Sequence, residues 1–210
     1  MGGTHGQKHN PYIQGRYAHV NPNDVVFTPD WLAQEIVSMF PISGKVLEPC
    51  KGEGAFLKVL PPQTEWCEIV DGKNFYDYLE KVDWIVTNPP YSDYNRFLSH
   101  SFEIAENIVL LVPFSKMFKS MGTIKATYAY GGIVSIDYLP ASQAGFPFGF
   151  PVAVFHIKKD YKGTTQIREF KDSAKNPSYN TRQDGSACSQ ASPKLPEQLE
   201  LNGIGQLHLA

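Results

Sequence analysis

Short apolar segments separated by Gly and Pro residues are the feature that most constrains the fold of this chain. They predict strands that alternate with helices. The expected strands are Lys45–Glu48, Glu65–Ile69, Trp84–Thr87, Asn107–Val112, Gly132–Leu139 and Val152–Lys158. The expected helices are Gly54–Leu60, Asn95–Ile104 and about Lys119–Tyr130. The alternation indicates an α/β fold with a mostly parallel sheet covered on both faces, in which the last two strands can form an antiparallel hairpin at the edge.

The two ends of the chain differ in composition from this central region. Residues 1–23 are rich in Gly, Asn, His and Tyr, which predicts an irregular N-terminal arm. Residues 163–210 are expected to form a disordered or loosely docked tail, because Lys171–Pro196 has almost no large apolar side chains to bury. The folded domain is therefore expected at residues 24–162.

A first helix is expected where the arm meets this domain. Thr28 is in the position of a helix N-cap, and Pro29 follows at the first helical position, where its missing N–H costs nothing. Pro41 cannot continue a helix, so it is expected to end this one.

Cysteine, histidine and apolar content exclude several classes of protein. The three cysteines form no CxxC pair and the six histidines have no ligand-like spacing, so no metal site is expected. No stretch approaches the roughly 20 apolar residues that cross a bilayer. The first residues also lack an apolar signal core. A cytoplasmic protein without membrane segments is therefore expected.

Charge is distributed unevenly along the chain, although the net charge is only −2. Residues 31–110 contain six Lys/Arg and twelve Asp/Glu, whereas residues 111–170 contain seven and three. A surface that binds a polyanion is therefore expected in the second half of the domain. Candidate phosphate contacts there are Ser115, Lys116, Lys119, Lys125, Lys158, Lys159 and Lys162.

The sharpest local motif is Asn88-Pro89-Pro90-Tyr91, directly after an apolar strand. Ligands of open α/β sheets bind at the carboxyl ends of the strands, where Asn88 is expected. The prolines have no N–H donors, so the Asn88 amide oxygen and a fixed Pro carbonyl form a site for an NH2 group. Tyr91 adds a ring against which a planar base can stack. The alternative is a simple turn that closes the strand.

A second motif is a glycine-rich turn after the first strand. It has the sequence EPCKGEGAF over residues 48–56, in which Glu48 ends the strand and Gly52 and Gly54 allow a ligand to approach the backbone. The complete GxGxxG and P-loop patterns are absent. An acid at the strand end favours a cationic or hydroxyl-bearing ligand over a phosphate.

Together, and in this order, the two motifs resemble those of the S-adenosylmethionine-dependent methyltransferases that methylate the N6 amine of adenine in DNA, in the gamma-type arrangement. The resemblance covers roughly residues 27–158 and implies a Rossmann-like class I methyltransferase fold with S-adenosylmethionine as cofactor. It implies that the helix start at Phe27-Thr28-Pro29 meets the cofactor carboxylate, which suits the affinity of helix N-termini for anions. The implied catalytic residues are Asn88, Pro89, Pro90 and Tyr91. The implied cofactor-binding residues are Thr28, Pro29, Glu48, Pro49, Cys50, Gly52, Gly54, Phe56, Glu68, Asn74, Phe75 and Asn88.

The region between the two motifs departs from the family pattern. The family places an acid after the second strand for the ribose, which the resemblance assigns to Glu68, with Asp71 as the alternative. It then uses an Asp-Phe pair for the cofactor adenine, which corresponds here to Asn74-Phe75. Glu68 and Asn74 are so close in sequence that the usual intervening helix is expected to be short or missing.

The family often has a second aromatic ring that stacks on the target base opposite the tyrosine. Phe146 matches this position best, and Phe148 and Phe150 are alternatives. Equally, these rings can simply pack a loop beneath the sheet.

The resemblance favours site-specific methylation of adenine N6 in DNA by base flipping and direct attack, as in restriction-modification enzymes. The alternatives are methylation of RNA adenine or guanine, methylation of a protein glutamine, and a non-catalytic binding subunit that retains the fold. Gamma-type DNA enzymes usually carry a target-recognition domain, for which no candidate follows the last expected strand. DNA is therefore the expected partner, and a separate recognition subunit can supply sequence specificity.

Overall fold

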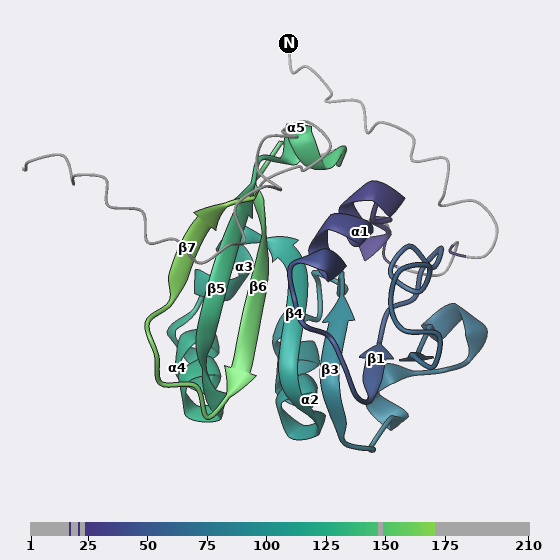
Figure 1. Ribbon diagram of the computed structural model, residues 1–210, viewed down its shortest axis with the longest axis horizontal. Helices are drawn as coiled ribbons and strands as arrows, with labels where there is room; N and C mark the ends of the chain where they lie inside the picture. Colours follow the sequence, from purple (N-terminus) through teal and green to yellow (C-terminus); the bar gives the residue numbers. More distant parts are fainter. Residues whose placement is uncertain (1–16, 18–20, 22–23, 147–148, 171–210) are drawn as a thin grey trace, which may run out of the picture.

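A seven-stranded mixed sheet lies at the centre of the computed structural model, which describes Tyr17, Asn21 and residues 24–146 and 149–170 (Figure 1). The strand order is β2-β1-β3-β4-β6-β5-β7. The strands are β1 (Val46–Glu48), β2 (Glu65–Trp66), β3 (Val82–Thr87), β4 (Ala105–Pro113), β5 (Gly131–Leu139), β6 (Val152–Lys159) and β7 (Gln166–Glu169). Most of the expected N-terminal arm and the expected tail beyond Phe170 lie outside the described residues.

The sheet combines a parallel half with an antiparallel strand. β2, β1, β3 and β4 are mutually parallel, β6 runs antiparallel to both β4 and β5, and β7 is parallel to β5. This arrangement confirms the expected α/β fold, with its mostly parallel sheet and antiparallel pair. The four parallel strands bring the ends of β1 and β3 to one edge, and these ends carry the two sequence motifs.

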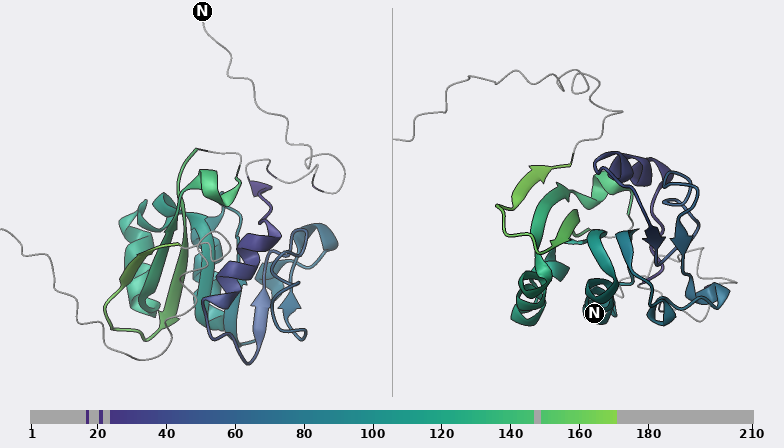
Figure 2. Two further views of the ribbon diagram at one scale, coloured as in Figure 1. Left: turned by 45° about the horizontal axis from the view of Figure 1, so that its top comes forward. Right: turned by 60° about the horizontal axis from the view of Figure 1, so that its bottom comes forward.

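Helices cover both faces of the sheet (Figure 2). The helices are α1 (Asp30–Ser38), α2 (Tyr94–Ile104), α3 (Phe114–Phe118), α4 (Met121–Tyr130) and α5 (Ala141–Ala144). α1 lies on one face, whereas α2 and α4 lie on the other. Side chains along β4 alternate accordingly: Ile108 and Leu110 pack in the core on the α2 side, and Val109 and Leu111 pack in the core on the α1 side.

The segment between β2 and β3 contains only two short 3-10 helices, η3 (Ile69–Asp71) and η4 (Phe75–Asp77). The expectation of a shortened or missing middle helix is therefore confirmed. The predicted strand Glu65–Ile69 is wrong in its second half. Glu68 instead accepts a hydrogen bond from the Val70 N–H and caps η3.

The predicted helix Gly54–Leu60 is also wrong, because this segment forms a series of turns. Its backbone hydrogen bonds span different numbers of residues. Lys58 N–H donates to the Gly54 carbonyl, as in an α-helix, whereas Val59 N–H donates to the Phe56 carbonyl, as in a 3-10 turn. Pro61 follows at once and supplies no N–H, so the segment is too short to propagate a regular helix.

Two helix starts also differ from the prediction. The helix expected from Lys119 begins at Met121, because the Ser120 hydroxyl accepts from the Thr123 N–H and caps it. At α1 the N-cap position is Pro29, and no side chain caps the helix. Thr28 therefore does not have the predicted capping role.

β7 lies within the segment that the sequence assigns to the tail. It adds to β5, so the antiparallel pair of β5 and β6 is not at the sheet edge as expected. Two contacts hold β7 in place. Arg168 forms two hydrogen bonds of 2.7 and 2.9 Å with the buried carboxylate of Asp137, and Phe170 is buried in the α1-side core. No apolar alternation marks this strand, because all four of its residues are exposed.

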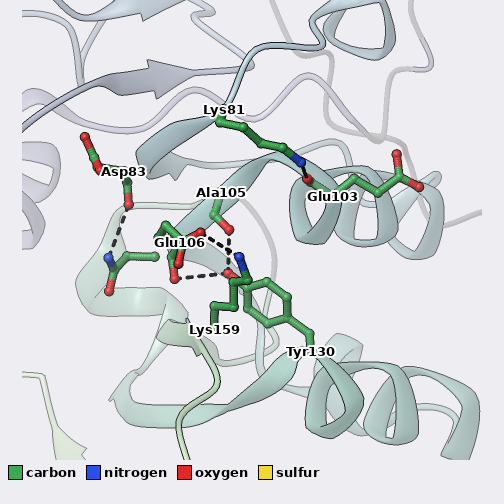
Figure 3. Close-up of polar contacts among 8 residues, drawn as sticks. Lys81, Asp83, Glu103, Ala105, Glu106, Tyr130 and Lys159 are labelled. Carbon is green, nitrogen blue, oxygen red and sulfur yellow. Dashed lines mark hydrogen bonds and ion pairs between the residues drawn. The ribbon is translucent and has the colours of Figure 1, made fainter.

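Polar contacts close the end of the sheet opposite the two motifs (Figure 3). The Tyr130 hydroxyl, at the end of α4, donates to the carbonyl oxygens of Ala105 and Glu106 at the start of β4. Lys159 at the end of β6 pairs with the Glu106 carboxylate at 2.7 Å. These contacts fix helix and strand ends away from the site, so the loops at the other edge are free to bind ligands.

Replacing Arg168 with Ala is expected to lower the free energy of unfolding by about 1–3 kcal/mol, the usual cost of leaving a buried acceptor of a charged hydrogen bond unsatisfied. The double variant D137N/R168A should be closer to the wild type, because it leaves no charge behind. Urea denaturation measures both. Equal stability of R168A and the wild type would contradict the structural role of β7.

Candidate cofactor and catalytic site

A cavity of about 150 Å3 lies where the chain leaves β1 and β3. Its walls come from the residues before α1, the turn after β1, the η3–η4 region and the end of β3. The predicted cofactor residues that line it are Pro49, Cys50, Gly52, Glu68, Asn74, Phe75 and Asn88. The structure thus brings residues of both motifs together around one cavity.

Several predicted residues lie outside this lining. Thr28, Pro29, Glu48, Gly54 and Phe56 are not part of it. Phe56 is buried in the α1-side core. Asp71, the alternative ribose ligand, pairs with the Lys51 ammonium at 2.7 Å. The structure therefore favours Glu68 over Asp71 as the carboxylate of the cavity.

Glu48 is the most deeply buried acid of this region, with 1% of its surface exposed. Its Oε1 atom accepts hydrogen bonds from the Thr87 hydroxyl at 2.5 Å and from the Cys50 N–H at 3.0 Å. Its Oε2 atom has no hydrogen-bond partner among the described residues. Burial raises the pKa of this carboxyl from 4.5 to about 8, against the opposing effect of the hydrogen bonds from Thr87 and Cys50.

The turn after β1 depends on glycine at two positions. Gly52 and Gly54 have φ angles of +52° and +81°, in the left-handed region that other residues rarely adopt. The Gly52 N–H donates to Glu68 Oε2 at 2.7 Å, which ties this turn to the η3 segment. A Cβ atom at Gly52 would lie 3.4 Å from the Phe27 ring in the cavity wall, whereas one at Gly54 would meet nothing within 4 Å. A contact of 3.4 Å is ordinary van der Waals packing, so backbone conformation, and not space, constrains both glycines.

The Asn74-Phe75 pair borders the cavity beside Glu68. The Asn74 side chain accepts from the Tyr76 N–H at 3.3 Å and caps η4. Phe75 is buried, and its ring lies 4.6 Å from the ring of Phe97 on α2. Packing against α2 thus fixes the aromatic part of this wall, while the amide of Asn74 remains at the cavity surface.

The Asn88 amide is held from two sides at the end of β3. Its Nδ2 atom donates to the Val26 carbonyl at 3.0 Å and to the Thr28 hydroxyl at 3.3 Å. Its Oδ1 atom accepts from the Tyr91 hydroxyl at 3.0 Å. Both hydrogen-bond partners of Nδ2 are acceptors, so they determine which end of the amide is the nitrogen and which is the oxygen. The oxygen therefore faces Tyr91.

The loop that carries the Asn-Pro-Pro-Tyr motif is anchored at its far end as well. Tyr91 is buried, which raises the pKa of its hydroxyl far above the ordinary value. Lys116 on α3 donates to the Tyr91 carbonyl at 2.7 Å. Asp24 accepts from both the N–H and the hydroxyl of Ser92. The loop is thus rigid between the segment before α1 and helix α3.

Sequence reasoning missed Asp24, Tyr17 and Tyr76 as cavity residues. Asp24 contacts Ser92 across 68 positions of the chain, so no local pattern reveals the pair. The short apolar run Val25–Phe27 is a signal that this segment is partly buried, since it follows a polar stretch.

The predicted base-stacking residue Phe146 and Tyr91 lie in different cores. Tyr91 packs in the core on the α2 side, whereas Phe146 is buried in the core on the α1 side. Of the alternatives, Phe150 is 44% exposed, and Phe148 lies outside the described residues. The role of Phe146 stays a prediction.

The described residues hold no group of three or more His, Cys, Asp or Glu side chains that could bind a metal ion. Within the same part of the chain, no helix has the length and apolar character needed to span a membrane.

Fold and cavity together correspond to the class I S-adenosylmethionine-dependent methyltransferase fold. Neither a protein-family model nor a curated protein sequence matches the chain, so this correspondence rests on solved structures. A candidate class I S-adenosylmethionine-dependent methyltransferase from Listeria monocytogenes superposes with a TM-score of 0.51 at 13% identity, over 76% of this chain and 70% of that one.

Two further structures share the fold. One is a candidate RNA methyltransferase from Pyrococcus horikoshii, with a TM-score of 0.52 and 16% identity over 67% of this chain and 91% of that one. The other is the methyltransferase subunit of a type I restriction-modification system from Streptococcus thermophilus. It has a TM-score of 0.50 and 18% identity over 72% of this chain. The match spans only 48% of that subunit.

The buried carboxyl of Glu48 is expected to make stability depend on pH. In the unfolded chain it loses its proton near pH 4.5, and in the folded protein only near pH 8. Its stabilising contribution is therefore complete below pH 4.5 and is lost as pH rises towards 8. The free energy of unfolding of the wild type should fall by a few kcal/mol relative to Glu48→Gln over this interval. Denaturant titrations at pH 5, 6, 7 and 8 measure the difference, and a constant difference would contradict the proposed burial of a neutral carboxyl.

Proposed function

We propose that this protein is a methyltransferase that transfers a methyl group from S-adenosylmethionine to the N6 amine of adenine in DNA. The observation that carries the proposal is the Asn88 amide at the end of β3. Its nitrogen is held by the Val26 carbonyl and the Thr28 hydroxyl, so its oxygen is an oriented acceptor at the edge of the cavity. An oriented amide oxygen beside a proline carbonyl matches the two donors of an aromatic amine.

The residues around the cavity fit the proposed cofactor. Glu48 lies outside the lining, but its buried Oε2 atom has no partner among the described residues, and loss of the carboxyl proton would suit a cationic group nearby. The left-handed backbone of Gly52 places this turn in the cavity wall without a side chain. Glu68 and Asn74 offer hydrogen-bonding groups for ribose hydroxyls and an adenine edge. When bound, the cofactor supplies a methyl group on a positively charged sulfur as the electrophile.

The chain's own residues then position the target amine. An adenine cannot reach this site while it is stacked in a duplex, so it must be flipped out, at a cost of a few kcal/mol. The Asn88 Oδ1 atom and the Pro89 carbonyl accept hydrogen bonds from the two N–H groups of the amine, which raises the electron density on nitrogen. As the nitrogen bonds to the methyl group, the methyl–sulfur bond breaks, the neutral thioether leaves with the electron pair, and the amine releases one N–H proton. The Tyr91 hydroxyl donates to Oδ1 here, so the incoming amine must replace that hydrogen bond. Positioning and fixed dipoles supply most of the rate.

The choice of DNA rests on two arguments. The Glu48-Pro49 form of the turn resembles the DNA enzymes more than the glutamine methyltransferases, which usually have Asp-x-Gly-x-Gly. The fold is also shared with a type I restriction-modification subunit, which makes a role in restriction-modification, with a separate recognition subunit, part of the proposal. RNA is the second candidate substrate, because the fold is equally shared with a candidate RNA methyltransferase.

Replacing Asn88 with Ala is expected to reduce methyl transfer by at least about 100-fold, the cost of removing one oriented polar contact. Cofactor affinity should stay within a few-fold of the wild type. Transfer of labelled methyl groups to DNA, RNA and protein, with product nucleosides identified, measures both activity and substrate. Asn107→Ala is the matched control, because Asn107 lies at the opposite end of the sheet and contacts the Asp83 carbonyl. Transfer by N88A near the wild-type rate would refute the catalytic assignment.

Two substitutions at Tyr91 separate its ring from its hydroxyl. Tyr91→Phe keeps a surface for stacking and removes only the hydroxyl that competes for Asn88 Oδ1. It should retain kcat within about tenfold. Tyr91→Ala also removes the stacking surface, which is worth about 1–3 kcal/mol per base, and should raise KM for DNA. Steady-state kinetics distinguish the two, and similar losses in both variants would argue against stacking.

A further inference from the structure

The surface formed by α3 and the first turns of α4 has a composition unlike the rest of the domain. It presents Lys116, Phe118, Lys119, Met121 and Lys125, which we call the α3–α4 face. From residue 111 to residue 136 the chain has three lysines and no carboxylate. In residues 31–110, by contrast, acids outnumber bases by twelve to six. The net positive charge of the domain is therefore concentrated in the part of the chain that forms this face.

Large apolar side chains are exposed between these lysines. Phe118 is 41% exposed and Met121 is 64% exposed, and both Lys119 and Lys125 are exposed beside them in the sequence. α4 is anchored beneath: its Thr123 and Thr127 side chains are buried, and Thr123 donates to Asn95 on α2 at 2.9 Å. The Phe118 ring, at the end of α3, packs on one side against Phe114 and Phe155 and is exposed on the other. A partly exposed ring held in this way, with exposed lysines beside it in the sequence, is suited to a ligand that carries both flat rings and negative charge.

The face adjoins the proposed catalytic loop. α3 begins directly after β4, at the same edge of the sheet as Asn88, and Lys116 donates to the Tyr91 carbonyl at 2.7 Å. A ligand that extends from the α3–α4 face therefore reaches the base-binding side of the site.

Carboxylates on the neighbouring elements are already paired. Asp93, at the start of α2, accepts from the Tyr76 hydroxyl at 2.6 Å and lies 3.8 Å from Arg96. Asp137 on β5 is buried and bonded to Arg168. Neither carboxylate neutralises the lysines of the face, so the face keeps its positive charge.

We infer that the α3–α4 face binds the DNA strand that carries the target adenine. Lys119 and Lys125 contact backbone phosphates, and the Phe118 ring stacks on an unpaired base next to the flipped one. This inference rests on the proposed function, because it takes the substrate from it. It adds the surface by which a chain with net charge −2 holds a polyanion.

The test is binding of a fluorescently labelled DNA that contains adenine, measured by anisotropy at several salt concentrations. Each phosphate contact contributes about 0.9 to the slope of log affinity against log salt on duplex DNA. The variant Lys119→Gln/Lys125→Gln should therefore lower the slope by about 1.8 and weaken binding at least tenfold at low salt. Phe118→Ala should weaken binding about tenfold and leave the slope unchanged. Unchanged cofactor affinity and far-ultraviolet circular dichroism show that the variants are folded.

The matched control is Lys58→Gln/Lys81→Gln, which removes the same charge from other surfaces: Lys58 pairs with Asp30, and Lys81 donates to the Glu103 carbonyl. Equal effects of the two double variants would overturn the inference, as would stronger binding to RNA than to DNA of equal length. Wild-type binding that depends on the α3–α4 face, without any methyl transfer, would support the inference and refute the proposed function instead.

Discussion

The hydrogen bonds of the Asn88 amide are the constraint on which the rest of the site depends. They join the segment before α1 to the end of β3, two parts of the chain about 60 residues apart. Val26 and Thr28 accept these bonds and so help to hold the segment before α1 as one wall of the cavity, and Asp24 adds a second link through Ser92. The proposed catalytic acceptor is therefore oriented by the cavity wall, while the link through Asp24 holds that wall independently of Asn88.

The sequence predicts the parts of this structure that are buried on both faces. β3, β4 and β6 each contain a short apolar run, and each was expected to within about two residues, because such runs are typical of strands buried on both faces. Short pieces were not predictable. The segment after Gly54 is cut short by Pro61, β2 has only two residues, and β7 is exposed on every residue and held by Arg168 and Phe170.

The candidate site was predictable to the same extent. Asn88 and Gly52 stand in local motifs, the resemblance supplied Glu68, and the structure places all three around one cavity. Asp24 has no motif, since its role comes from a distant partner. Charged residues are divided between two parts of the domain. Acids lie around the cavity proposed for the cationic cofactor, and lysines lie where α3 follows β4. The two reactants proposed here differ in charge, so each is drawn to a different side of Asn88.

Both edges of the sheet end in very short strands. β2 has two residues and β7 has four, so each edge offers few unpaired backbone groups. On the β2 side the chain passes directly into 3-10 turns, and on the β7 side Arg168 and Glu169 place charges along the strand. Short or charged edges hinder pairing with the strands of another molecule. A domain whose middle helix is reduced to short 3-10 turns therefore keeps its protection against edge-to-edge aggregation.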